Sequence, residues 1–266
     1  PQITDWEDPL IPIPCSVAIW SSMEKMEEIL RMFGISCRGT GGMLLDRLSF
    51  TLGSGEILGI LGSPSEERRA IGRVLTGQIQ PEDGTLYIHE QPEAFPDVRT
   101  AQEKRIFHIS PDSRLMNHMD LAENLCLIRP SSLVPHSERV WVKRKNIHLL
   151  CEEYLEECGV EADPYAYPDE YSRGEQYTFL VMKAMMCGAE TVVLDSIGQP
   201  FLHAVMEHRD LIEHMRKAEG AMILIDSHIE ELMYRCDRIY TFREGRMSGS
   251  LFRDEYSRSL LMEMML

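Results

Sequence analysis

The 266-residue sequence contains no uninterrupted apolar run that approaches the roughly 18 residues needed to cross a bilayer. No basic segment followed by an apolar one opens the chain, so nothing there resembles a secretory signal peptide. Positive charge is also scarce, because 27 lysines and arginines face 43 aspartates and glutamates, which gives a formal net charge of −16. Direct binding to nucleic acid or to anionic lipid is therefore not expected as the main activity.

Paired cysteine and histidine motifs are absent as well. The seven cysteines form no C-x-x-C pair, and an odd, unpatterned count predicts reduced thiols in the cytoplasm rather than a disulfide framework. No H-E-x-x-H motif occurs, and His203, His208 and His214 are five and six residues apart, which does not stack them on one helical face. We therefore expect no metal site built from these histidines. With 44% hydrophobic and 26% charged residues, the composition is that of an acidic, soluble, globular protein.

The chain is expected to divide near residue 26. Residues 1–26 are proline-rich ("EDPLIPIP") and are predicted to be a linker or the tail of a preceding domain, whereas 27–266 are predicted to be one domain. Residues 27–35 and 44–52 are expected to pair as antiparallel strands around a glycine-rich turn at 39–42. The apolar run 57–61 suits a strand buried on both faces, with a helix after it that ends at Leu75.

The rest of the chain changes character twice. Residues from about 112 to 185 have helical periodicity and no convincing strand, so we expect a helical insertion there. Strands and helices then alternate, with strands predicted at 191–195 and 221–226, one helix over 204–220, and a hairpin at 238–252. This alternation predicts an α/β fold with a largely parallel sheet and helices on both of its faces.

Four short segments raise the question of chemistry. "GSPSEERRA" (62–70) lies between a strand and a helix, where a phosphate-binding loop would lie, yet it holds two glutamates and a proline in place of glycines and a lysine. "YSRGEQ" (171–176) begins a helix. "TVVLDS" (191–196) and "ILIDSH" (223–228) are buried strands that end in an acid and in a histidine. Each segment alone is weak evidence for a function, but the order and spacing of all four would rarely arise by chance.

Together these segments resemble the ATP-binding-cassette (ABC) transporter ATPase family over roughly residues 27–250, and most closely the second of the two fused cassettes in carbohydrate-importer ATPases. "FTLGSGEILGILG", "MDLAENL" and "ILIDSHIEEL…CDRIYTFREGR" carry the resemblance with the four segments. It implies an α/β, RecA-like P-loop NTPase core with an N-terminal antiparallel β element and a helical insertion. It also implies ATP and Mg²⁺ as cofactors, a second cassette and transmembrane permease subunits as partners, and a cytoplasmic position at the inner face of the membrane through that permease.

The resemblance also implies roles for individual residues. Gly62 opens the phosphate loop, whose family members hold phosphates with backbone N–H groups and a lysine at a helix N-terminus. Asp195 matches the acid that helps to hold Mg²⁺, and His228 matches the switch histidine near the γ-phosphate. Ser172 and Gly174 match the signature motif, which reaches across a dimer to the partner's nucleotide.

Several residues depart from the family pattern in the loop itself. Ser65 and Glu67 stand where the loop has glycines. Arg68 takes the lysine position, as in the importers' second cassettes, and Arg69 replaces the hydroxyl residue that would touch Mg²⁺.

Other departures lie outside the loop. Ser196 replaces the catalytic glutamate, so the residue that would polarise the attacking water is missing. Arg173 interrupts the paired glycines of the signature. No glutamine occurs at 108–112, where the glutamine loop is expected, and no aromatic adenine-stacking residue is evident near 35–40. We therefore predict a nucleotide site that is weak or inactive in hydrolysis.

Two interpretations of the loop remain. In the first, Ser63 caps a helix that starts early, with Pro64 at its first position. The carboxylates of Glu66 and Glu67 then take the place of the nucleotide's phosphate. In the second, the loop stays open and Arg68 keeps weak nucleotide affinity. Each lost charge-assisted hydrogen bond costs roughly 1.5–3 kcal/mol, so losing two or three would weaken binding a hundredfold or more.

Three functions follow from these alternatives. The leading hypothesis is a degenerate nucleotide-binding domain of a sugar-type importer, which lends its signature motif to a partner's ATP site. The second is an active ATPase that uses Arg68, Asp195 and His228 with an unconventional base. The third is a scaffold or regulatory module that has left transport.

Overall fold

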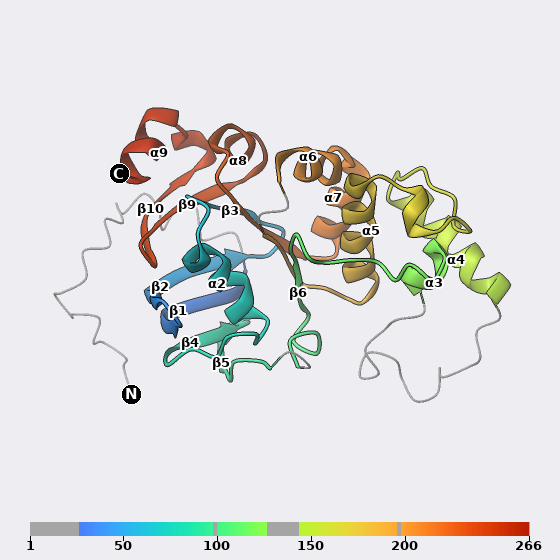
Figure 1. Ribbon diagram of the computed structural model, residues 1–266. Helices are drawn as coiled ribbons and strands as arrows, with labels where there is room; N and C mark the ends of the chain where they lie inside the picture. Colours follow the sequence, from blue (N-terminus) through green and yellow to red (C-terminus); the bar gives the residue numbers. More distant parts are fainter. Residues whose placement is uncertain (1–26, 98–99, 127–143, 196–197, 266) are drawn as a thin grey trace.

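A computed structural model describes residues 27–97, 100–126, 144–195 and 198–265. The predicted linker 1–26 and Ser196 lie outside these ranges. Within them the chain forms two β-sheets and a set of helices, which Figure 1 shows in chain order from blue to red.

The N-terminal sheet is antiparallel and has four strands in the order β2-β1-β4-β5. Their bounds are β1 Glu28–Gly39, β2 Gly42–Gly53, β4 Asp83–Ile88 and β5 Gln91–Glu93. The predicted pairing of β1 with β2 is confirmed, with Leu30 opposite Leu52 and Met32 opposite Phe50. The turn between them falls at 40–41, inside the predicted glycine-rich segment.

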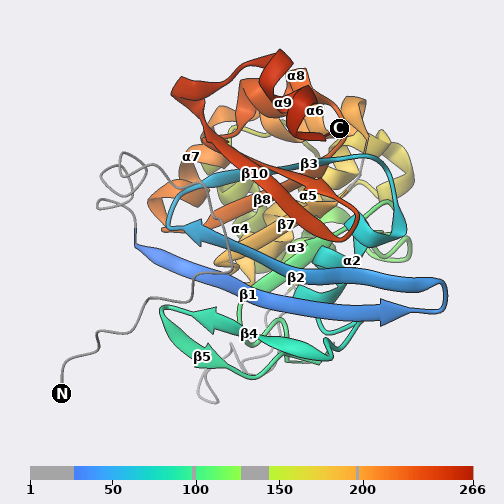
Figure 2. The ribbon, with the colours of Figure 1, turned by 90° about the vertical axis from the view of Figure 1, so that its left-hand side faces the viewer.

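The second sheet has six strands in the order β10-β9-β3-β8-β7-β6. Their bounds are β3 Ile57–Gly62, β6 Ile106–Ile109, β7 Thr191–Asp195, β8 Ala221–Asp226, β9 Arg238–Arg243 and β10 Arg246–Phe252. Figure 2 labels four of them, β10, β3, β8 and β7. All neighbours from β9 to β6 pair in parallel, and β10 adds an antiparallel edge. The predicted parallel sheet with a terminal hairpin is therefore confirmed.

Helices connect these strands. Their bounds are α2 Glu66–Leu75, α3 Leu121–Cys126, α4 Arg144–Glu157, α5 Arg173–Met186, α6 Gln199–Glu207, α7 Arg209–Lys217, α8 Ile229–Arg235 and α9 Arg258–Met265, with short 3₁₀ turns at Pro168–Glu170 and Arg253–Glu255. The prediction of one helix over 204–220 is wrong, because the backbone leaves helical geometry at His208 (ψ 87°) and separates α6 from α7.

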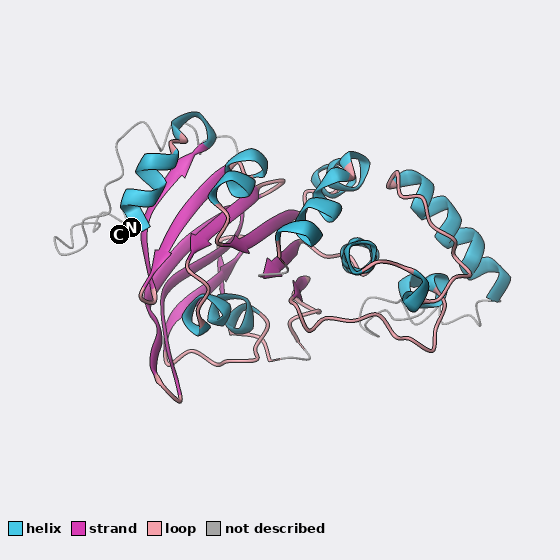
Figure 3. Ribbon diagram, turned by 45° about the horizontal axis from the view of Figure 1, so that its top comes forward, coloured by secondary structure: helices cyan, strands magenta, loops and turns pink. Residues whose placement is uncertain are grey.

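The parallel sheet separates two hydrophobic cores. In the tilted view of Figure 3, helices (cyan) lie on both sides of the strands (magenta). All six residues of β3 are buried, and they alternate between the two sides. Leu58 and Ile60 pack toward the antiparallel sheet and α2, whereas Ile57 and Leu61 pack toward the other helices. A strand buried on both faces needs a continuous apolar run, which explains why this segment could be predicted.

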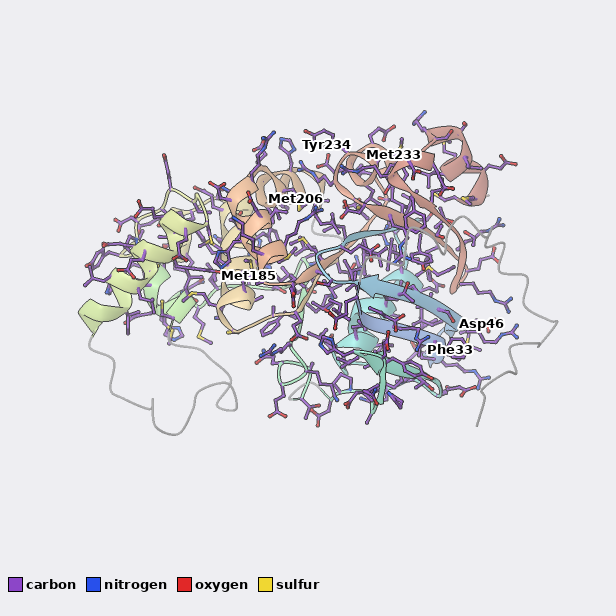
Figure 4. All side chains as sticks on the ribbon, turned by 180° about the vertical axis from the view of Figure 1, so that it is seen from behind. Phe33, Asp46, Met185, Met206, Met233 and Tyr234 are labelled. Atoms are coloured by element: carbon purple, nitrogen blue, oxygen red, sulfur yellow. The ribbon has the colours of Figure 1, made fainter. Side chains whose placement is uncertain are left out.

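The two sheets are joined where β2 passes the β9–β10 turn. The Asp46 carboxylate, labelled in Figure 4, accepts a hydrogen bond from Arg246 Nε at 2.9 Å, and the Asp46 N–H donates to the Gly245 carbonyl at 2.9 Å. Gly245 has φ 80°, and a Cβ there would lie 3.0 Å from the Leu44 carbonyl, so this turn requires glycine. The contact fixes the antiparallel sheet against the β9–β10 edge of the six-stranded sheet.

Large apolar side chains are also exposed on separate elements. Figure 4 shows Tyr234 on α8 and Phe33 on β1 at well-separated places, and they are 75% and 53% exposed.

In the part of the chain that the structure describes, no helix combines the length and the apolar character that crossing a membrane requires.

Candidate nucleotide-binding site

The candidate site lies at the carboxyl ends of three neighbouring parallel strands. Leu61 of β3 lies opposite Asp226 of β8, and Asp195 of β7 lies opposite Ile225. The segment that follows β3, the acid that ends β7 and the acid that ends β8 therefore meet at one edge of the sheet. Ligands of open α/β sheets bind at this edge.

The helix after β3 begins at Glu66, and Ser65 is its N-cap. Ser65 is extended (φ −153°, ψ 162°), and its hydroxyl accepts a hydrogen bond from the Arg68 N–H at 3.2 Å. The prediction that Ser63 caps the helix is wrong. Ser65 supplies the same hydroxyl two residues later, and Pro64 stays outside the helix instead of entering its first turn.

Glu66, one of the two glutamates expected to replace the anion, points elsewhere. Glu66 is 65% exposed, and its carboxylate lies 3.4 Å from Arg69 and 3.6 Å from Arg73 along the surface of α2. The interpretation in which Glu66 fills the phosphate seat is therefore wrong. Glu67 is half-buried in the same turn.

The group turned into the loop is the cation of Arg68. The residue is only 2% exposed, and its guanidinium donates a hydrogen bond to the Gly62 carbonyl. Burial lowers the pKa of Arg68 from its usual value, and the carboxylates of Asp226 and Asp195 act in the opposite direction. The positive charge at the lysine position is thus held by the chain's own carbonyl and carboxylates.

The acid at the end of β7 is held by a histidine that the sequence analysis did not single out. Asp195 Oδ2 lies 3.3 Å from His108 Nε2, and both side chains are buried (3% and 6% exposed). A Cβ at Gly72 of α2 would lie 2.7 Å from the same nitrogen, so α2 packs closely on His108. His108 stands in the segment where a glutamine was expected, and that position was the available signal.

The histidine after β8 is also engaged within the chain. His228 Nδ1 lies 2.6 Å from Asp226 Oδ1, which also accepts hydrogen bonds from the N–H groups of Ser227 at 2.6 Å and His228 at 3.1 Å. The imidazole is half-exposed, whereas the carboxylate is buried. Asp226 therefore fixes His228 and contributes negative charge at the strand edge.

Several groups of this arrangement differ from those with which a phosphate loop holds a magnesium nucleotide. Phosphate loops need inward N–H groups and a cation directed at the ligand, but Pro64 has no N–H, and Ser65 already accepts from the Arg68 N–H. The Arg68 guanidinium is directed at Gly62, and Arg69 is 53% exposed on the outside of α2. The buried Asp226 adds a carboxylate that would repel a polyphosphate.

The signature turn, residues 172–174 at the start of α5, is more accessible to solvent than the buried Arg68 of the loop before α2. Ser172 is exposed and caps α5, its hydroxyl accepting from the Glu175 N–H at 3.3 Å, and Glu175 Oε2 accepts in turn from the Ser172 N–H at 2.8 Å. Gly174 is buried, and a Cβ there would lie 2.9 Å from the Cβ of Ala204 on α6. Gly174 therefore also has a packing role, since no larger residue fits between α5 and α6.

The parallel core and the place of these motifs at its strand ends define a P-loop NTPase fold of the cassette type. A family model described as ABC transporter matches residues 45–197, which is more than half of the chain, and the chain therefore belongs to the ABC transporter family.

Curated relatives are ATP-binding proteins of sugar import. The arabinose import ATP-binding protein of Chromohalobacter salexigens is 30% identical over 224 residues, 83% of this chain and 44% of that protein. The arabinose protein of Burkholderia cenocepacia is 27% identical over 85% of this chain and 44% of its own length. The ribose import protein of Clostridium perfringens is 25% identical over 91% of this chain and 48% of its own length. The chain thus spans somewhat less than half the length of these relatives.

Solved structures share the fold. A nucleotide-free ATP-binding cassette from an ABC transporter superposes with a TM-score of 0.73 at 15% identity, covering 90% of this chain and 99% of that one. A cassette in its ADP conformation gives a TM-score of 0.72 at 16% identity, covering 89% and 98%. These matches confirm the predicted ABC ATPase fold with its antiparallel β element.

Proposed function

We propose that this chain is a degenerate nucleotide-binding domain of a sugar-type ABC importer. In this proposal its own nucleotide site is silent, and it presents Ser172 and Gly174 to ATP held by an intact partner cassette. It is coupled to a transmembrane permease and lies at the cytoplasmic face of the membrane. The names of the relatives, which import arabinose and ribose, support the sugar-import part of the proposal.

The observation that carries the proposal is the orientation of Arg68. Its buried guanidinium is bound to the Gly62 carbonyl and lies within electrostatic reach of Asp195 and Asp226. A phosphate would have to displace these interactions, and each charge-assisted hydrogen bond lost costs roughly 1.5–3 kcal/mol. The site therefore lacks the preorganised positive charge on which phosphate binding depends.

The start of α5 supports the second half of the proposal. Ser172 is exposed, and its Glu175 partner is exposed too, so both can exchange their mutual hydrogen bonds for a ligand's. Exposed charges are screened by solvent, which lowers the repulsion that Glu175 would exert on a phosphate. An approaching anion would also meet the positive end of the α5 dipole.

Titration calorimetry with MgATP on the purified chain tests the silent site. We expect no saturable heat at micromolar nucleotide. The matched variant restores the family residues of the loop (Ser65→Gly, Glu67→Gly, Arg68→Lys, Arg69→Ser), and we expect it to bind more tightly than the natural chain. A micromolar dissociation constant for the natural chain would contradict the proposal.

ATP turnover of the complex with an intact cassette and a permease tests the signature role. We expect Ser172→Phe to lower turnover at least tenfold, because the bulky side chain blocks the turn. Ser257→Phe is the control, since Ser257 Oγ also accepts the N–H three residues on, at 3.5 Å, but at α9, away from α5 (Figure 1). Unchanged turnover in Ser172→Phe, with the complex intact, would count against the signature role.

A further inference from the structure

Arg173, the residue between Ser172 and Gly174, directs its side chain away from the signature turn. Its Nη2 donates hydrogen bonds to the Ser113 carbonyl at 2.6 Å and to the Pro111 carbonyl at 3.2 Å. These two carbonyls belong to the segment that follows β6, sixty and sixty-two residues earlier in the chain. The side chain that replaces a signature glycine is thus a long-range tie and does not cover the turn.

The contact is completed from α5 itself. Arg173 Nη2 also donates to the Tyr177 hydroxyl at 3.0 Å, and the guanidinium carbon lies 4.3 Å from the centre of the Tyr177 ring. Tyr177 is 2% exposed, and its hydroxyl donates to the Pro111 carbonyl at 3.3 Å. Gln176 Oε1 accepts from Arg173 Nη1 at 3.1 Å. A planar guanidinium that donates to four side-chain and backbone acceptors and lies over a ring has one well-defined position.

The place of this contact in the fold gives it a consequence. Residues 110–120 lead out from β6 to α3, and α5 leads back toward β7, so Arg173 joins the outgoing connection to the start of the returning helix (Figure 1). The segment 110–113 is itself a closed turn, in which the Ser113 N–H donates to the Ser110 carbonyl and the Ser110 N–H donates to Ser113 Oγ, both at 3.0 Å.

We propose that Arg173 is a positioning residue that clamps segment 110–113 to the first turn of α5 and thereby holds Ser172 and Gly174 at a fixed place relative to the parallel sheet. The clamp is made entirely by the chain's own groups, so the signature turn keeps its place without a nucleotide in the chain's own site. This inference rests on the proposed function, in which that turn faces the partner's ATP.

Hydrogen exchange on the full chain tests the clamp. We expect Arg173→Gly to accelerate amide exchange in 110–113 and 172–177 about tenfold, because local opening no longer breaks the Arg173 contacts. Arg173→Lys should give an intermediate rate, since an ammonium replaces one contact but not the fork. Exchange in β3, β7 and β8 should stay unchanged in both variants, which separates a local effect from a loss of folding.

Arg114 offers a matched control. Its guanidinium also donates to the carbonyls of Pro111 and Ser113, but from within the same segment, so it cannot tie that segment to α5. We expect Arg114→Ala to leave exchange in 172–177 within twofold of the natural chain. Equal acceleration in Arg114→Ala and Arg173→Gly, or no acceleration in Arg173→Gly, would overturn the clamp.

The assembled complex provides a readout that a purely structural role would not move. With complex formation unchanged, Arg173→Gly should lower the kcat with which the complex hydrolyses the ATP held by the partner at least threefold. Arg173→Lys should recover part of this loss of kcat. If exchange responds while Ser172→Phe leaves turnover unchanged, the clamp stands and the proposed function fails. If exchange does not respond, the clamp fails whatever the turnover.

Discussion

Replacing Arg68 with methionine removes the cation from the candidate phosphate loop while keeping an unbranched side chain. Arg68 is 2% exposed, and the acids that its charge faces, Asp195 and Asp226, are 2% and 4% exposed. Removing one partner of a buried ionic group costs about 3–5 kcal/mol, because the remaining charge stays buried. His108 still faces Asp195 in the variant, so we expect the lower end, about 3 kcal/mol.

Urea unfolding followed by circular dichroism measures this loss as a shift of the midpoint at constant slope. Arg69→Met is the matched control, because Arg69 is the next residue, is 53% exposed and pairs with Glu66 at the surface. Exposed pairs of this kind contribute about 0–1 kcal/mol. Combining Arg68→Met with Asp226→Asn should recover part of the loss, since the second change removes the carboxylate that the first leaves uncompensated. Coupling between such neighbours is about 0.5–3 kcal/mol.

Two results would refute this reasoning. One is a loss for Arg68→Met that does not exceed the loss for Arg69→Met, because the cation would then not be buried among acids. The other is strict additivity of Arg68→Met and Asp226→Asn, because the two groups would then not interact. A gain of micromolar MgATP affinity in Arg68→Met would contradict the electrostatic reasoning for this loop, since a variant that lacks the Arg68 cation should bind phosphate still less.

Two further substitutions have defined outcomes. Gly72→Ala would ordinarily stabilise a helix by about 1 kcal/mol, but here the new Cβ would lie 2.7 Å from His108 Nε2, so thermal unfolding should show a net loss of about 1–2 kcal/mol, and a gain would contradict the packing. Burial alone would raise the pKa of Glu190, but hydrogen bonds from His89 and Arg105 lower it overall. The contribution of ionised Glu190 to the free energy of unfolding is therefore present above pH 4.5 and is lost as the pH falls through the lowered pKa. Glu190→Gln should thus lose less stability between pH 5 and pH 3 than the natural chain, by no more than about 1 kcal/mol.

The strands were predictable because burial on both faces leaves a continuous apolar run in the sequence. β3, β7 and β8 are each buried throughout, and each ends one residue beyond its apolar run. The helix break at His208 was not predicted, because no proline or glycine marks it in the sequence and it shows only in the backbone angles of His208.

The site was predictable in position but not in its contacts. Ser63 and Ser65 are equally good N-cap residues, so the sequence alone did not decide which one caps α2, and the structure assigns the cap to Ser65. The contact of His108 with Asp195 joins residues 87 positions apart and becomes visible only when β6 and β7 pair. The burial of Arg68 and its contact with the Gly62 carbonyl likewise become visible only in the folded chain.

The two helix starts of the candidate site share one cap chemistry and differ in what surrounds it. Ser65 accepts the N–H three residues on at α2, and Ser172 does the same at α5. At α2 the next cation, Arg68, is buried and bound internally, so an incoming phosphate would have to break contacts that solvent does not screen. At α5 the neighbouring Arg173 is turned away onto segment 110–113, and the acid beside the turn, Glu175, is exposed and screened. These differences in burial and charge are what the proposed function rests on: a silent phosphate site at the start of α2, and a start of α5 that is open to a phosphate from outside the chain.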